Sequence, residues 1–250
     1  MKFDIMTLFP DMVETVLSES IIGRARKGGI ISVRCHNIRD FSENKHRNVD
    51  DTPFGGGMGM VMAAPPIYNC FEAVKKDFAE GERVRVIYMS PKGKVLTQAH
   101  ASRLCAYDRL VILCGHYEGV DQRVLNEIVD EEISIGDYVL TGGELPACIL
   151  VDSVSRMLEG VLSSPECYEN ESIAGGLLEH PQYTRPVEFH GVRVPDVLLS
   201  GHHAKIEEWR LEESLAITKE RRPELYEAYL IAHPPKVKKP RKKKTPKENV

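Results

Sequence analysis

The sequence lacks long apolar runs and closely spaced cysteines. No segment approaches the roughly 18 apolar residues of a membrane-spanning helix, and Asp4 interrupts the apolar stretch that a signal peptide needs. We therefore expect a soluble protein of the cytoplasm with no membrane partner. The six cysteines are never closer than nine residues apart, which excludes a C-x-x-C redox pair and a zinc knuckle. Free, mostly buried thiols are expected.

The usual fingerprints of nucleotide and metal sites are also missing. No glycine precedes Lys and Ser or Thr at Walker spacing, and no dinucleotide-binding glycine pattern follows a strand. Four histidines lack the spacing with acidic partners that a metal site requires, and structural or solvent-exposed roles are expected for them. These residues are His180, His190, His202 and His203. P-loop and NAD-dependent enzymes are therefore disfavoured.

Charge is present but unevenly distributed along the 250 residues, whose formal net charge is −4. Residues 234–250 contain eight Lys or Arg and one Glu, a net charge of +7, whereas residues 1–233 contain 25 basic and 36 acidic residues, a net charge of −11. This distribution excludes a uniformly basic nucleic-acid binder. The basic tail has almost no apolar content and is expected to be disordered, either attracting nucleic-acid phosphates or acting as a solubilising extension.

Short apolar runs alternate with helical periodicity, which predicts an α/β fold with a parallel sheet. The expected strands are residues 3–9, 30–35, 84–89 and 110–114. One helix is expected to begin at Pro10, and three others are expected over residues 65–78, 97–106 and 144–158. Periodicity is lost over residues 163–176, which predicts a linker. Beyond it, residues 205–221 and 224–232 predict two amphipathic helices of a smaller C-terminal domain.

A long polar loop over residues 37–59 contains basic, acidic and glycine-rich segments. His46-Arg47 and Asp50-Asp51 precede the run Gly55-Gly56-Gly57-Met58-Gly59. Consecutive glycines let a backbone approach a ligand closely, and the neighbouring charged residues suit contacts with a phosphate or a base. A surface loop without a binding role explains the same composition equally well.

Two further segments follow the expected strands. Ligands of open α/β sheets bind beyond the carboxyl ends of strands, where residues 90–93 and 115–119 lie. In residues 134–146, glycines bracket a short apolar stretch that can wrap an aromatic ligand, with Tyr138 and Leu140 as apolar walls. A tight connection needed only for packing is the alternative.

An arginine near this segment and nearby carboxylates suggest proton-transfer chemistry. Arg156 can stabilise a developing oxyanion while a linker carboxylate, Glu169 or Glu171, removes a proton. Considered individually, each of these residues is also explained as a solvated or ion-paired side chain.

Taken together and in order, the motifs resemble the TrmD family, tRNA (guanine-N1)-methyltransferases that modify the guanosine immediately 3′ of the anticodon. The resemblance covers about residues 1–225. The matching segments are Leu8-Phe9-Pro10, Arg39-Asp40-Phe41, His46-Arg47, Val49-Asp50-Asp51, Gly55-Gly56-Gly57, Gly59-Met60, Tyr88-Met89-Ser90-Pro91, Cys114-Gly115-His116-Tyr117-Glu118-Gly119, residues 134–147, Asp152-Ser153-Val154-Ser155-Arg156, Gly175-Gly176-Leu177-Leu178, Tyr183-Thr184-Arg185-Pro186 and residues 197–203.

The resemblance implies a fold of the SPOUT class, in which part of an α/β domain is threaded into a trefoil knot. The implied organisation is a knotted cofactor-binding domain (1–162), a flexible linker (163–176), a helical tRNA-binding domain (177–233) and a basic disordered tail (234–250). It also implies an antiparallel homodimer in which each active site is shared between subunits. A non-catalytic RNA-binding protein on the same scaffold is the competing hypothesis.

The resemblance also implies roles for individual residues. S-adenosyl-L-methionine would be bound by Ser90, Gly115, Glu118, Ile135, Gly136, Asp137, Tyr138, Val139, Leu140, Gly142, Gly143 and Pro146. The target guanosine and its neighbour would be bound by His46, Arg47, Asp50, Asp51, Gly57 and Gly59. Mg²⁺ is implied in turnover, with no residues assigned to hold it.

Two residues depart from the family pattern. The catalytic Arg falls on Arg156, but the general base, an Asp in the family, falls on Glu171, with Glu169 as the alternative. Glu keeps the carboxylate and adds one methylene, so we expect the same role with a shifted linker backbone. Met58 replaces a small residue or Pro in the glycine-rich loop and puts no role in doubt.

Overall fold

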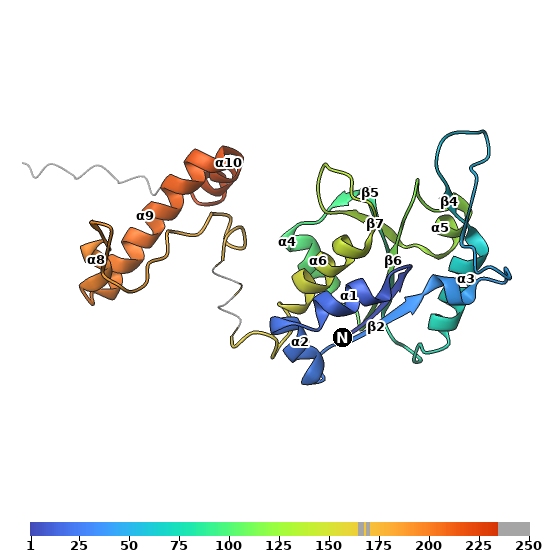
Figure 1. The fold of residues 1–250 in the computed structure, drawn as a ribbon. Helices are drawn as coiled ribbons and strands as arrows, with labels where there is room; N and C mark the ends of the chain where they lie inside the picture. The colour runs from blue at the N-terminus through green and yellow to red at the C-terminus, as the bar shows by residue number, and fades with distance from the viewer. Residues whose placement is uncertain (165–167, 169–170, 235–250) are drawn as a thin grey trace, which may run out of the picture. The chain divides into compact units, whose positions relative to one another are not determined.

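Five parallel strands form the centre of the first part of the chain (Figure 1). The computed structural model describes residues 1–164, 168 and 171–234, and the chain divides into two units, Met1–Tyr168 and Glu169–Val250, each considered by itself below. The strands are β1 (Lys2–Thr7), β2 (Ser32–Asn37), β5 (Val84–Val95), β6 (Arg109–Cys114) and β7 (Glu131–Ser134). Their spatial order is β2-β1-β6-β5-β7, and every neighbouring pair is parallel. The predicted parallel α/β sheet is confirmed.

Helices cover both faces of this sheet. One face carries α1 (Pro10–Leu17), α2 (Ser20–Lys27), α4 (Gln98–Leu104) and α6 (Glu144–Ser155), and the other carries α3 (Ala64–Lys75) and α5 (Gln122–Ile128). Side chains alternate along β1 between these two faces. Phe3 and Ile5 pack into the hydrophobic cluster on the face that carries α6, and Met6 packs into the cluster on the face that carries α3. Strand β6 is buried along its whole length, as its unbroken apolar run requires.

Local sequence determines where several helices begin. Helix α1 starts at Pro10, whose missing N–H costs nothing in a first turn. The Thr97 hydroxyl caps α4 by accepting from the His100 N–H at 3.2 Å, and the Asp121 carboxylate caps α5 by accepting from the Arg123 N–H at 2.9 Å.

Some elements differ from the sequence-based expectation. Strand β5 continues to Val95 through an irregularity between Met89 and Lys94, whereas a strand ending at residue 89 was expected. Helices α2 and α5 and strand β7 were not predicted. The loop expected over residues 37–59 contains the 3-10 helix η1 (Ile38–Phe41) and strand β3 (Asp50–Asp51), which pairs with β4 (Val61–Met62).

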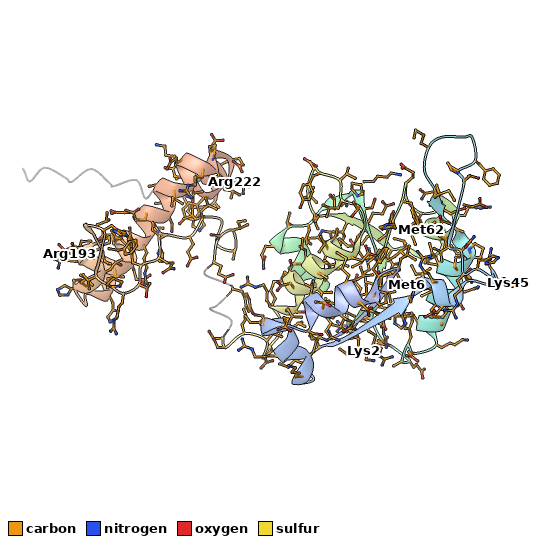
Figure 2. All side chains as sticks on the ribbon, in the orientation of Figure 1. Lys2, Met6, Lys45, Met62, Arg193 and Arg222 are labelled. Atoms are coloured by element: carbon orange, nitrogen blue, oxygen red, sulfur yellow. The ribbon has the colours of Figure 1, made fainter. Side chains whose placement is uncertain are left out.

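An ion-pair network occupies the end of the sheet where β1 and β6 begin. The Arg109 guanidinium, 1% exposed, contacts the Asp4 carboxylate, which is 2% exposed, and bonds to Glu82 at 3.2 Å. His36 Nε2 lies 2.8 Å from Asp4, and Lys2 Nζ lies 2.9 Å from Glu82. These buried charges are therefore paired, as burial requires. Figure 2 labels Lys2 and Met6 toward opposite ends of β1.

The second unit contains the two expected C-terminal helices, α9 (His203–Arg221) and α10 (Pro223–Ala232), preceded by the short α8 (Asp196–Leu199). A two-residue turn joins β8 (Glu188–Phe189) to β9 (Val192–Arg193), and the two strands form an antiparallel hairpin. Glu169 and, apart from Pro234, the basic tail lie outside the described residues. Within the described part of the chain, no helix has the length and apolar character needed to cross a membrane.

Candidate active site

A cavity of about 310 Å³ lies beyond the carboxyl ends of the central strands of the first unit. Its walls come from three stretches of the chain, residues 88–92, 115–122 and 132–146, together with Val61 and Leu125. These stretches include part of β5, the loop that follows β6, the end of β7 and the start of α6. The cavity therefore lies where ligands of open parallel sheets bind.

Most residues expected to bind a cofactor surround this cavity. Those that line it are Ser90, Gly115, Glu118, Ile135, Tyr138, Val139, Leu140, Gly142, Gly143 and Pro146. Gly136 and Asp137 do not line it. The N–H of Gly136 donates to Ser134 Oγ at 3.1 Å, and the Ser134 hydroxyl donates back to the Gly136 carbonyl at 3.0 Å. Gly136 thus stabilises the turn after β7 without lining the cavity, and Asp137 is exposed.

Close backbone contacts bring two of the walls together. The Gly143 N–H donates to the Gly115 carbonyl at 2.8 Å, and a Cβ at Gly143 would lie 2.8 Å from Cys114 Cα. A Cβ at Gly115 would lie 2.7 Å from the Tyr88 hydroxyl. Only glycine fits these approaches without moving a neighbour, so residues 142–143 pack directly on the end of β6.

The cavity lining combines backbone groups, apolar walls and a few charged side chains. Lys92, Glu118 and Glu132 line it, and Tyr88 lies among them. Burial, with the nearby Glu132 carboxylate as the second cause, raises the pKa of Tyr88 to about 12. Glu132 Oε2 and His116 Nδ1 are buried and have no hydrogen-bond partner among the described residues.

The glycine-rich loop is attached to the rim of this cavity. The Met62 N–H donates to the Gly119 carbonyl at 2.9 Å, and the Glu118 N–H donates to the Met60 carbonyl at 3.0 Å. A Cβ at Gly59 would lie 2.5 Å from Glu118 Cγ. The loop extends away from the sheet beside β4, and its tip exposes 99% of Phe54 (Figure 1).

The residues expected to bind the guanosine are all on this loop. Asp50 and Asp51 form β3 at its base, and Gly59 lies next to Glu118. Arg47 pairs with Asp40 at 3.2 Å. His46 and Gly57 are exposed. The structure therefore places Gly59 at the cavity rim, next to Glu118, and Asp50 and Asp51 in the strand pair at the base of the loop.

The two expected catalytic residues lie in different units, and each is described within its own. Arg156 ends α6 and lines a second cavity of about 530 Å³, which shares Ile135, Tyr138 and Leu140 with the first. Glu171 lies in the second unit, where its carbonyl accepts from the Ala174 N–H at 3.3 Å. The alternative base, Glu169, lies outside the described residues.

Neither a metal site nor a reactive thiol emerges from the described residues. No group of three or more His, Cys, Asp or Glu side chains in this part of the chain is placed to hold a metal ion. Five cysteines are free and buried or half-buried, as expected, and Cys167 lies outside the described part. Burial is the main cause that raises the pKa of Cys35 and Cys70 to about 12. Thiolate chemistry is therefore disfavoured at both.

Several lining residues were not assigned a role from sequence. They are Tyr88, Lys92, His116, Tyr117, Gln122 and Glu132. Four of them belong to segments that were singled out, since Tyr88 and Lys92 flank Ser90 and His116-Tyr117 follows Gly115. Glu132 carried no such signal, because the strand that contains it was not predicted.

Comparison with known proteins identifies the family. A family model described as tRNA (Guanine-1)-methyltransferase TrmD matches residues 1–228. The tRNA (guanine-N(1)-)-methyltransferase of Ruminiclostridium cellulolyticum is 56% identical over 226 residues, 90% of this chain and 96% of that protein. The proteins of the same name from Lachnospira eligens and Geobacter sulfurreducens are 56% and 53% identical, covering 93% and 90% of this chain and 98% and 91% of their own lengths. The chain therefore belongs to the tRNA (guanine-1)-methyltransferase TrmD family.

Proposed function

We propose that this protein transfers a methyl group from S-adenosylmethionine to N1 of the guanosine immediately 3′ of the anticodon in tRNA. One observation carries the proposal beyond family membership. All but two of the residues expected to bind the cofactor line a single cavity at the carboxyl end of the sheet. A tRNA substrate also favours the cytoplasm as the site of action.

The lining of the cavity fits this cofactor. Leu140 and Pro146 provide apolar surface for an adenine ring, and the backbone of residues 135–143 provides donors and acceptors. The Glu118 and Glu132 carboxylates complement a cationic ligand. When bound, the cofactor supplies a methyl group on a sulfonium, which is already a good leaving group.

Residues of the protein then have to remove the proton from guanine N1. The Glu171 carboxylate accepts this proton, and the Arg156 guanidinium stabilises the negative charge that develops on O6. Alignment of N1 with the methyl group contributes the rest. Residues of the glycine-rich loop, including His46 and Asp50, hold the guanosine outside its stack, because N1 is inaccessible within one.

A homodimer with a shared active site is part of this proposal. The second cavity is lined by apolar side chains of α1 and α6, of which Val16, Leu145 and Ile149 are about half exposed. An apolar surface of this kind is typical of an interface. Because Arg156 lines the same cavity, a partner subunit docked there would contribute to the site.

The remaining parts of the proposal concern the knot, the domain boundaries and Mg²⁺. We propose a trefoil knot in which residues 142–143 pass against the end of β6, supported by the Gly143–Gly115 hydrogen bond. The cofactor domain (1–162), linker (163–176) and tRNA-binding domain (177–233) are proposed with the boundaries expected from sequence. Mg²⁺ remains a proposed participant without an assigned site.

A methyl-transfer assay tests the proposed reaction. With unmodified tRNA, transfer is expected when guanosine follows the anticodon and not when adenosine does, since adenine has an amino group in place of O6 and offers Arg156 no oxygen on which negative charge can develop. Equal transfer to both would contradict the chemistry. Absence of S-adenosylmethionine binding in calorimetry would favour a non-catalytic RNA-binding protein.

The general base has its own test. Glu171→Gln removes the proton acceptor and should lower the transfer rate by roughly 10²- to 10⁴-fold while cofactor affinity is kept. Glu179→Gln, an exposed carboxylate eight positions further along the same segment, should transfer at the normal rate. A Glu171→Gln variant with normal turnover would move the base to Glu169 or another residue.

A further inference from the structure

Glu132 is a half-buried residue of the cavity lining whose direct contact with the cofactor has not been assigned. Glu132 lies on β7 directly beside Tyr88 of β5, in the register of this parallel pair. Cross-strand neighbours point to the same face of a sheet, so both side chains face the layer that contains α5. The next residue, Ile133, packs into the cluster on the opposite face.

The environment of Glu132 differs from that of its neighbour Glu131. The Glu131 carboxylate accepts from Arg85 at 3.0 Å and from Arg103 at 2.7 Å, and His100 lies 3.2 Å from it. By contrast, Glu132 Oε2 is buried with no hydrogen-bond partner among the described residues. A buried acceptor without a partner is unfavourable, and more so when it is charged.

The surroundings of Glu132 belong to the cavity. Tyr88, Gly115 and Gln122 line it together with Glu132, and the Tyr88 hydroxyl reaches to within 2.7 Å of the position that a Cβ of Gly115 would take. Lys92, the lining residue with a cationic side chain, forms no ion pair with Glu132 in the described part of the chain. The missing donor is therefore expected from a ligand in the cavity.

We propose that Glu132 is a cofactor-binding residue whose carboxylate accepts a hydrogen bond from a donor group of S-adenosylmethionine. This inference rests on the proposed function, because it takes the cofactor as the occupant of the cavity. Three groups of the cofactor can donate to a carboxylate: the ammonium group of its methionine part, the hydroxyls of its ribose and the amino group of its adenine. All form charge-assisted bonds with a carboxylate.

Calorimetric titration of the full-length protein tests the assignment. Glu132→Gln should weaken the binding of S-adenosylhomocysteine roughly ten- to hundredfold, because a hydrogen bond to a charged group is lost. Glu127→Gln, an exposed carboxylate on α5, serves as the matched control and should bind normally. Unchanged affinity in Glu132→Gln would overturn the inference, whereas a wild-type protein that fails to bind would overturn the proposed function instead.

A second ligand identifies the donor. 5′-Methylthioadenosine keeps the ribose but lacks the ammonium group. If the ammonium is the donor, Glu132→Gln and wild type should bind this ligand equally; if a ribose hydroxyl or the adenine amino group is the donor, the variant should bind it more weakly by the same factor. Should Glu132→Gln fail to fold, Glu132→Asp carries the test: the shortened carboxylate should weaken S-adenosylhomocysteine severalfold, and wild-type affinity would overturn the inference.

Discussion

Individual charges at the amino end of the sheet are stabilised by their partners. Burial alone would raise the pKa of Glu82, but hydrogen bonds from Lys2, the Ala79 backbone and Arg109 outweigh it and lower the pKa to about 2. Asp4 follows the same pattern, because hydrogen bonds from His36 and Arg109 overcome its burial and lower its pKa. Both carboxylates therefore stabilise the folded state in their ionised form.

The low pKa of Glu82 predicts a pH-dependent contribution to stability. Glu82→Gln should lower the melting temperature near pH 7, where the carboxylate is ionised in both folded and unfolded chains. The difference between variant and wild type should narrow as the pH falls from about 4.5 to about 2, since over that range Glu82 is protonated in the unfolded chain but still ionised in the folded one. Thermal unfolding across this pH range measures it, with the exposed Glu80→Gln as control. A difference independent of pH would contradict the assignment.

Residues at the cavity were predictable where they follow an apolar run. Ser90 and Gly115 come after runs that read as strands, so their place at the carboxyl end of a sheet was expected. Glu132 was not, because β7 has only four residues and two of them are Glu. Arg109 had no sequence signal for burial either, since its partners Asp4 and Glu82 lie far from it in the chain.

Among the elements, α6 has two faces with different roles. Leu150 and Val154 are completely buried against the sheet, whereas Leu145 and Ile149 are about half exposed along the second cavity. The same helix thus contributes to the core of the first unit and to the proposed dimer surface. Substitutions on its two faces should have separable effects.

One pair of variants tests this separation. Leu150→Ala should lower the free energy of unfolding by about 2–5 kcal/mol, because it leaves a cavity in the core. Ile149→Lys should change core packing little but shift the protein from dimer to monomer by placing a charge on the proposed interface. Denaturant unfolding and sedimentation measure the two effects. A dimer that persists in Ile149→Lys would contradict the proposed surface.

Strong periodicity made most elements predictable, and its absence explains the omissions. Helix α3 was expected from the spacing of Ile67, Phe71 and Val74. A helix of seven residues leaves little room for a repeat, so that of the two helices of this length α4 was expected and α5 was not, although Asp121 caps it. Strand β5 extends past Pro91 and Gly93, residues that usually end a strand, because an irregularity accommodates them.

In the whole molecule, charge is divided between an acidic body and a basic end. Residues 1–233 carry a net charge of −11 and residues 234–250 a net charge of +7. An acidic body binds tRNA only where basic groups are gathered locally. Removing the basic tail therefore tests whether its Lys and Arg side chains contribute to the attraction of tRNA phosphates.

Removal of residues 235–250 should flatten the dependence of tRNA affinity on salt. Each lost phosphate contact lowers the slope of log affinity against log salt by about 0.7–0.9. A chain of unchanged length with the eight Lys and Arg of this segment replaced by Gln is the matched control and should show the same slope as the truncation. An unchanged slope in both would show that the tail takes no part in binding.

The arrangement of the strands was not available from periodicity. Ile5 of β1 pairs with Cys35 on one side and with Ile112 on the other, although the latter is more than a hundred positions away. Apolar patterns identify strands but carry no information about which strands are neighbours. For this reason the parallel sheet was predictable and its order was not.

The three-walled cavity has a consequence for the lifetime of the protein. Its walls come from stretches around residues 90, 118 and 140, and the Gly143–Gly115 hydrogen bond joins two of them. A ligand held there binds the folded chain only, so at a hundred times its dissociation constant it adds about 2.7 kcal/mol to the free energy of unfolding. For S-adenosylmethionine, the ligand proposed for this cavity, starvation would then increase unfolding and degradation, coupling the abundance of the enzyme to the supply of methyl donor.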